Sequence, residues 1–351
     1  MRVPLSISLS LSHPASALLP PPPRRRSDLY TENGIRAPSF TFAEYLPQFG
    51  AYVSALTAQA GLPPARIQGG TFCCHRGDFD AGIDTILSSF TSELASFSYH
   101  HYPLSHCHGS SPTLSQLLAD DASTKGVHEL APFAADAAKR GVPFFIGEGN
   151  SVSCGGTKGV SDVFGATLWA VDVLFNAAAA GISRWNFHGC PEGAYTAVAY
   201  PSPTTSDVPD VRPLFYGIWL FTQATAHRAS TYAPAVTTSN PLIKVHASRD
   251  GGGVWRVVLI HKDASAGVGA ARVTVAAPAG AAGAASLLRM APTSGGASAH
   301  NGIYLSGLTF DNSTDGRPVG TLVPEAVPLA AGGYAFDLDA ASLVLLTLPP
   351  V

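Results

Sequence analysis

Between residues 66 and 225 the sequence alternates four times between a short apolar run and a longer amphipathic one, and this alternation most constrains the fold. It predicts strands over 66–72, 94–99, 142–147 and 182–187, and helices near 81–90, 127–139, 161–180 and 211–225. Strands that alternate with helices pair in parallel, because each helix returns the chain to the same edge of the sheet. Four such units amount to roughly half of an eight-stranded β/α barrel.

After about residue 240 the helical pattern stops. Short alternating or apolar runs separated by turns rich in Gly, Ala, Pro and Asp predict strands over 243–247, 254–260, 272–276, 286–290, 303–310, 334–338 and 343–348. This pattern is typical of an antiparallel β-sandwich. The predicted fold class is therefore α/β plus all-β, with the C-terminal half of a (β/α)8 barrel over 28–235 and a β-sandwich over 236–351.

Residues 1–27 differ in composition from the rest of the chain. Alternating Ser and Leu give way to four prolines over 20–23 and three arginines over 24–26, a low-complexity composition that predicts a disordered leader. The run 3–11 and the segment 15–17 resemble a signal peptide only loosely, because Pro4 and three serines interrupt the run.

The composition excludes several classes of protein. The 351 residues are 46% hydrophobic and 13% charged, which is unlike a disordered chain, and a net charge of −3 offers no basic field for nucleic acid. No apolar run reaches the roughly 20 residues that span a bilayer. The five cysteines allow at most two disulfides and leave their pairing open: Cys73, Cys74, Cys107, Cys154 and Cys190.

Glu148 is the first ionisable residue after the apolar run 142–146, and a polar, glycine-rich loop follows it over 149–159. In a β/α barrel the chemistry lies at the carboxyl ends of the strands. Position alone therefore makes Glu148 a candidate catalytic carboxylate, although an ion pair in a loop would explain its position equally well.

The loop sequence adds a resemblance. Gly147-Glu148-Gly149-Asn150-Ser151, then Cys154-Gly155-Gly156 and 159–162, resemble the nucleophile loop of glycoside hydrolase family 79, which contains β-glucuronidases and is related to heparanase. The resemblance extends from Asp28 to the C-terminus and includes the strand end 185–189. It implies an extracellular retaining glycosidase that acts on β-glucuronide-containing carbohydrate, with Glu148 as the nucleophile.

The resemblance also implies residues that contact the sugar. His101 and Tyr102 would line the pocket, a tyrosine that donates to Glu148 would favour the ionised carboxylate, and Asn150 would orient Glu148 or the sugar. Packing of the pocket wall and a turn are the respective alternatives. The uronate carboxylate would be bound by Tyr195 and by the backbone amides of Ser153, Cys154, Gly155 and Gly156.

The sequence departs from the family at one decisive place. The family has Asn-Glu-Pro-Asp after its fourth barrel strand, with the glutamate as general acid/base, whereas Arg25, Arg26 and Ser27 occupy the first three of these positions here. We therefore expect a truncated or wrongly joined gene product that lacks its acid/base. The alternative is a catalytically silent remnant or a carbohydrate-binding protein.

Other motifs predict no chemistry. Cys73-Cys74-His75 and His106-Cys107-His108 lack the paired spacing of a metal site and are interpreted as structural. Gly149–Ser153 fails the G-x-S-x-G pattern of a nucleophilic serine at its last position. The sequence therefore predicts no cofactor and no metal.

Overall fold

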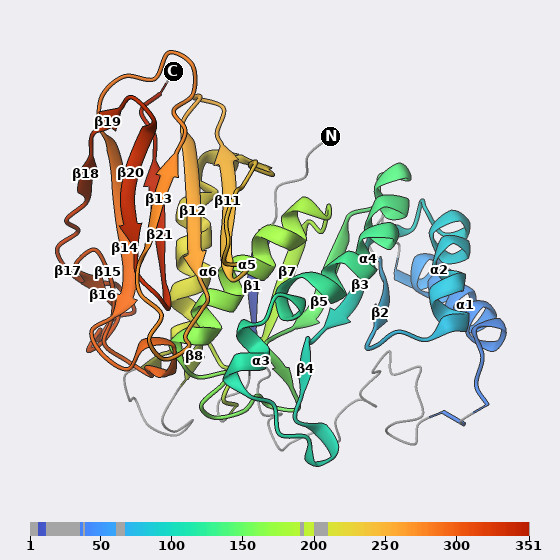
Figure 1. The fold of residues 1–351 in the computed structure, drawn as a ribbon. Coiled ribbons are helices and arrows are strands. Elements are labelled where there is room, and N and C mark those ends of the chain that lie inside the picture. The colour runs from blue at the N-terminus through green and yellow to red at the C-terminus, as the bar shows by residue number, and fades with distance from the viewer. Residues whose placement is uncertain are drawn as a thin grey trace.

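The computed structural model describes residues 6–11, 36–37, 39–60, 67–189, 193–199 and 210–350, which form an α/β part and an antiparallel β part side by side (Figure 1). The helices are α1 Phe42–Ala60, α2 Gly77–Ser89, α3 Leu114–Leu118, α4 Asp121–Lys139, α5 Phe164–Ala179 and α6 Pro213–Ala224. None of these helices is both long enough and apolar enough to cross a membrane.

The α/β part is built on a five-stranded sheet of order β1-β7-β5-β3-β2, with every neighbouring pair parallel. Its strands are β1 Ser6–Leu11, β2 Ile67–Phe72, β3 Leu94–His101, β5 Phe144–Gly149 and β7 Arg184–Gly189. The four strands expected from the alternation are confirmed, in the order expected for successive strand–helix units.

The predicted disordered leader differs from the structure at residues 6–11, which form a strand. β1 pairs in parallel with β7, in the register Ser6 with Arg184 through Leu11 with Gly189. The alternation Ser-Ile-Ser-Leu-Ser-Leu has the period of two that a strand requires. The four prolines over 20–23 and the three arginines over 24–26 lie outside this segment. The rest of the leader lies outside the described residues.

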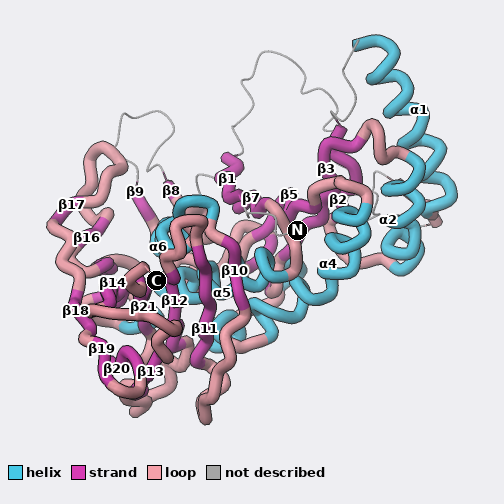
Figure 2. The backbone as a smooth tube through the Cα atoms, turned by 90° about the horizontal axis from the view of Figure 1, so that it is seen from above, coloured by secondary structure: helices cyan, strands magenta, loops and turns pink. Residues whose placement is uncertain are grey.

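Helices cover one face of the parallel sheet (Figure 2). Phe79 of α2 packs edge-on against Phe72, Phe133 of α4 stacks on Tyr99, and Trp169 of α5 meets Trp185. The opposite face is more polar, because Gln68 bonds Ser98 across β2 and β3 there. The apolar run 142–146 would suit a strand buried on both faces, but Phe145 is only half buried.

Helix α5 begins three residues later than the sequence predicted. The predicted helix near 161–180 starts at Ser161, a residue type typical of N-caps, but the N-cap is Val163. The Ser161 hydroxyl instead accepts a hydrogen bond from the backbone N–H of Thr157 and contacts the Ser151 hydroxyl at 3.0 Å. Residues 161–163 consequently belong to the loop that precedes the helix.

The second part consists of two antiparallel sheets, of order β10-β11-β12-β21-β14-β15-β16-β17, with β18 beside β14, and β13-β20-β19. The strands are β10 Ser230–Tyr232, β11 Ile243–Arg249, β12 Trp255–His261, β13 Ala271–Val275, β14 Ala285–Pro292, β15 Ile303–Leu305, β16 Leu308–Thr309, β17 Val319–Gly320, β18 Glu325–Val327, β19 Leu329–Ala330, β20 Gly333–Leu338 and β21 Ser342–Thr347. Leu287, Phe336 and Leu346 are among the side chains of the core shared by these sheets. All seven predicted strand regions are confirmed, although the sheet starts at β10, slightly before the expected boundary at 235/236.

The other face of the large sheet packs on α5 and α6, where Val258, Ile260 and Leu345 join the core of the α/β part. A buried ionic cluster lies at this junction. Asp172 of α5 accepts from Lys262 Nζ at 2.7 Å and lies 2.8 Å from His246 Nε2, so both partners come from the β part. Burial by itself would raise the pKa of Asp172, but hydrogen bonds and charges from His246 and Lys262 hold it well below its usual value.

Candidate active site

Glu148 lies at the carboxyl end of β5, and a β-bulge sets its direction. The register between β3 and β5 pairs Tyr99 with Ile146 and then His100 with Glu148, so Gly147 is the extra residue. A bulge re-aims the side chain that comes after it. Glu148 therefore lies beside His100, whose Nδ1 is 3.8 Å from Glu148 Oε1.

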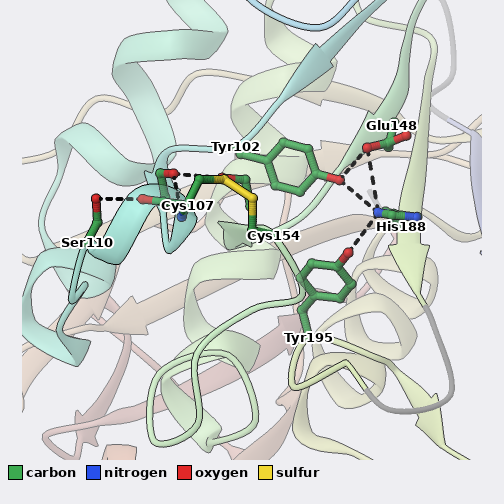
Figure 3. Close-up of a disulfide and its surroundings, with 9 residues drawn as sticks. Tyr102, Cys107, Ser110, Glu148, Cys154, His188 and Tyr195 are labelled. Carbon is green, nitrogen blue, oxygen red and sulfur yellow. Dashed lines mark hydrogen bonds and ion pairs between the residues drawn. A yellow bond between two sulfur atoms is a disulfide. The ribbon is translucent and has the colours of Figure 1, made fainter. Parts of the chain in front are cut away.

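Two tyrosines and a histidine surround this carboxylate (Figure 3). The Tyr102 hydroxyl donates to Glu148 Oε1 at 2.7 Å and lies 3.0 Å from His188 Nδ1. The Tyr195 hydroxyl lies 2.8 Å from the same nitrogen, which is itself 3.6 Å from Glu148 Oε1. Residues at or just after the carboxyl ends of β3, β5 and β7 thus meet in one cluster, as expected for this edge of a parallel sheet.

The raised pKa of Tyr102 makes its hydroxyl the donor in the hydrogen bond to Glu148. Burial, followed by the charge and hydrogen bond of Glu148, raises the pKa of Tyr102 well above its usual range. The phenol therefore keeps its single proton and can donate it to Glu148 in a hydrogen bond. The Tyr102 proton is then committed to Glu148, and the Tyr195 hydroxyl is the second hydroxyl in contact with His188 Nδ1.

The loop after Glu148 is fastened at several points. β6 Val152–Ser153 pairs in parallel with β4 Leu104–Ser105, and a disulfide joins Cys107 to Cys154. The sequence left this pairing open, because the two cysteines are 47 residues apart and only the fold brings them together. Figure 3 shows the disulfide and Glu148 on opposite sides of Tyr102.

A pocket of about 570 Å³ lies on this loop. Within the described part of the chain it is lined by His106, Cys154, Gly155, Gly156, Thr157, Lys158, Gly193 and Ala194. His106 and Lys158 can carry positive charge, and none of the eight is acidic. Cys154, Gly155 and Gly156 have positive φ angles of 60°, 94° and 80°. Successive backbone N–H groups in such a turn form a concave site for anions.

Gly156 and Asn150 connect this pocket to the tyrosine cluster. A Cβ on Gly156 would lie 2.7 Å from the backbone N of Tyr195, so only glycine permits this approach. The Asn150 side chain is fully buried and donates to the backbone carbonyls of His188 and Tyr195 at 2.8 and 3.0 Å. The Asn150 side chain thus holds the backbone of these two residues in place, and its amide group contacts these carbonyls rather than Glu148, which it was expected to orient.

Two other residues expected to contact the sugar, Ser153 and His101, neither line this pocket nor contact Glu148. Ser153 contacts Ser105 and Cys107 through its hydroxyl and is not a lining residue of the pocket. His101 is buried on the helix-covered face, edge-on to Trp185, and does not join Glu148. Burial lowers the pKa of His101 to about 4, with a further contribution from His75.

Sequence reasoning missed His100 and His188 as neighbours of Glu148. Successive residues of a strand point to opposite faces, so only one of His100 and His101 can face the carboxylate. The helix-facing series Phe97, Tyr99 and His101 identifies His100 as that residue. His188 could have been found from the strand end that carries the family resemblance.

The histidine–cysteine motifs show no metal geometry. Over the described ranges, no three His, Cys, Asp or Glu side chains are grouped so that they could hold a metal ion. Cys107 is instead part of the disulfide, and His106 lines the pocket. Cys190 lies outside the described residues.

Comparison by sequence gives no relative: no protein-family model matches the chain, and no curated protein matches it significantly. Comparison by structure gives many. The chain superposes on a 4-O-α-L-rhamnosyl-β-D-glucuronidase from Fusarium oxysporum 12S, in its complex with Rha-GlcA, with a TM-score of 0.74 and 22% identity over 89% of this chain and 66% of that one.

Arabinofuranosidases of family GH51 are similar to a lesser degree. The enzyme from Xanthomonas axonopodis pv. citri gives a TM-score of 0.58 at 14% identity, over 85% of this chain and 62% of that one. The enzyme from Thermotoga petrophila RKU-1 gives a TM-score of 0.58 at 14% identity, over 92% of this chain and 65% of that one. The chain spans less than two thirds of the length of each of the three. The chain shares its mixed fold, a parallel α/β sheet joined to an antiparallel β domain, with these glycosidases.

Proposed function

We propose that this chain binds β-linked glucuronides and carries the nucleophile of a retaining glycoside hydrolase, Glu148. One observation supports this most: Tyr102 donates a short hydrogen bond to Glu148 at the carboxyl edge of the parallel sheet. The structural likeness to a glucuronidase, at 22% identity, agrees with the sequence resemblance to family 79 without establishing the substrate.

The contacts of Glu148 suit nucleophilic attack. Tyr102, His100 and His188 all approach the same oxygen, Oε1. Within the described residues Oε2 has no hydrogen-bond partner, and the side chain is 36% exposed. We assign Oε2 as the atom that bonds to the anomeric carbon, while the contacts to Oε1 hold the carboxylate in position.

The pocket beside Tyr195 suits the uronate carboxylate. Backbone N–H groups of Cys154–Gly156 and the nearby His106 and Lys158 favour an anion, and no lining residue repels one. A glucuronide with its anomeric carbon at Glu148 would place its carboxylate in this pocket.

Retaining hydrolysis also requires a second carboxyl about 5 Å from the nucleophile, which protonates the leaving oxygen. The Asn-Glu-Pro-Asp pattern that carries this group in the resembled family is absent from the sequence. We propose that the chain forms the glycosyl-enzyme only with leaving groups that depart without a proton, and that it turns over ordinary glucuronides negligibly.

The experiment uses 2,4-dinitrophenyl β-D-glucuronide, whose leaving group needs no general acid. We expect a burst of one dinitrophenolate per chain and a covalent gain of one glucuronosyl group, located on Glu148 by peptide mapping. Azide should then release the sugar as a β-glycosyl azide, since azide attacks without general-base assistance.

Glu148→Gln should abolish the burst while retaining the affinity for glucuronate. Glu93→Gln, the same change directly before β3 at the opposite edge of the sheet, should leave the burst unchanged. A label on any other carboxylate would refute the assignment of Glu148. Saturable glucuronate binding with no burst would instead favour the carbohydrate-binding alternative.

A further inference from the structure

Cys73 and Cys74 lie apart from the proposed active site and play no part in the function described above. They directly follow β2, at the same edge of the sheet as Glu148 but two strands away. Cys73 is half buried and Cys74 is exposed. Their Sγ atoms are 3.0 Å apart.

This sulfur–sulfur distance is unusual for neighbouring residues. In an extended strand, successive side chains point to opposite faces. The chain bends at Cys74, and the bend turns both thiols to one side. Tyr99 holds the bend, because its hydroxyl contacts the Cys74 carbonyl oxygen at 2.6 Å and Asp80 Oδ1 at 2.8 Å.

The Cys107–Cys154 disulfide shows that the fold accommodates an oxidised cysteine pair, and such pairs persist in oxidising compartments. A metal is a poor occupant of the Cys73–Cys74 pair, because no third ligand from the described ranges completes a site there. The chemistry that suits two adjacent thiols, one of them exposed, is thiol–disulfide exchange.

We propose that Cys73 and Cys74 form a two-thiol redox site that closes reversibly into a vicinal disulfide by exchange with a small-molecule disulfide. The exposed Cys74 thiolate attacks the small disulfide, forms a mixed disulfide and expels one small thiolate. Cys73 then attacks Cys74 Sγ and expels the second. Two protein thiols lose two protons and two electrons, and one small disulfide is reduced to two thiols.

The ring should open more easily than the Cys107–Cys154 bond. Consecutive Cα atoms are about 3.8 Å apart across a trans peptide, whereas disulfides usually join Cα atoms about 4.4–6.8 Å apart. The Cα atoms of Cys107 and Cys154 are 5.5 Å apart, within this usual range. Closing the Cys73–Cys74 ring therefore strains it, and strained disulfides are the more readily reduced ones.

The test equilibrates the folded chain in buffers of reduced and oxidised glutathione, quenches with acid, alkylates free thiols and maps the peptides by mass. We expect the Cys73–Cys74 peptide to lose two hydrogens and both alkylation sites on oxidation. The Cys73–Cys74 peptide should regain its two hydrogens and both alkylation sites on reduction. This should occur in a buffer at least about tenfold less reducing than the buffer that reduces the Cys107–Cys154 disulfide. In reduced protein, phenylarsine oxide, which bridges two thiols, should add once to this peptide.

Cys73→Ser and Cys74→Ser should each abolish the loss of hydrogens and the arsenical adduct. Cys73→Ser should instead accumulate one glutathione on Cys74, whereas Cys74→Ser should carry none. Cys190→Ser is the matched control and should change neither readout. Thiols that stay alkylatable in the most oxidising buffer would refute the proposal. Glutathione on both cysteines, or a bond from either one to Cys190, would refute it equally.

Discussion

The buried Asp172–Lys262 pair offers a quantitative test of how the two parts of the chain are joined. Both side chains are at most 1% exposed. Lys262 Nζ contacts Asp172 Oδ2 at 2.7 Å and the Ser123 hydroxyl at 3.0 Å, so the ammonium group has no water to replace either partner. Breaking such a pair leaves an uncompensated buried charge, which costs about 3–5 kcal/mol.

We expect Lys262→Met, which keeps the length of the side chain, to lower the free energy of unfolding by about 3–5 kcal/mol, and Asp172→Asn to lower it by a similar amount. The double variant removes both charges of the Asp172–Lys262 pair and should cost clearly less than the sum of the two single changes. Urea unfolding followed by tryptophan fluorescence measures all four proteins. Trp169, which donates to the Ala122 carbonyl beside this cluster, is a suitable reporter.

Arg272→Met and Asp337→Asn form the matched control. This pair bridges β13 and β20, with side chains 64% and 62% exposed, and its removal should cost less than about 1 kcal/mol. If the losses of unfolding free energy in the two single variants add up to the loss in the double variant within about 0.5 kcal/mol, Asp172 and Lys262 are not coupled and the reasoning is refuted.

The pH dependence gives an independent check. The pKa of Asp172 in the folded chain lies well below its usual value, whereas an unfolded aspartate titrates near about 3.9. The unfolded state thus binds more protons at low pH, and the contribution of Asp172, present above pH ~4, is lost as pH falls through the folded pKa. Asp172→Asn should flatten the acid limb of the stability curve.

Three further outcomes are expected. Because burial lowers the pKa of His101 to about 4, unfolding free energy should fall by up to about 3 kcal/mol from pH ~6.5 to pH ~4, and His101→Leu should remove this slope in urea titrations. Tyr102→Phe should slow formation of the glycosyl-enzyme by about 10–100-fold in stopped-flow measurements, since it removes a hydrogen bond to a charged group. Gly156→Ala, whose Cβ would lie 2.7 Å from Tyr195 N, should weaken glucuronate binding in calorimetry at least about tenfold, whereas Gly159→Ala, equally left-handed but in open space, should not.

The period of the sequence was sufficient to predict the parallel strands β2, β3, β5 and β7 and the later change to antiparallel strands. Apolar residues recur in these elements wherever a helix or a second sheet covers one face. The burial of one face is therefore visible in the sequence as a regular spacing of apolar residues. β1 was missed because the leader was judged by composition, although residues 6–11 alternate with the strand period.

The site was less predictable, because it depends on contacts between distant segments. The bulge at Gly147 exists only in the register of β5 against β3, so no property of residues 144–149 alone fixes where Glu148 points. The Cys107–Cys154 pairing likewise depends on β4 lying beside β6. The side of the sheet on which His101 lies could have been predicted. Side chains alternate between the two faces along β3, so His100 and His101 must point in opposite directions.

The β part supports the proposed active site directly. α5 begins where the loop after Glu148 ends, and its first N–H, that of Phe164, donates to the carbonyl oxygen of Ala299 in the β part at 2.8 Å. His300 contacts the Asp162 carbonyl oxygen at 3.1 Å. The middle of α5 is held to the β part by the contact of Asp172 with Lys262. The loop is therefore fixed by the disulfide on one side and by the β part on the other, and the position of the Cys154–Gly156 amides depends on both.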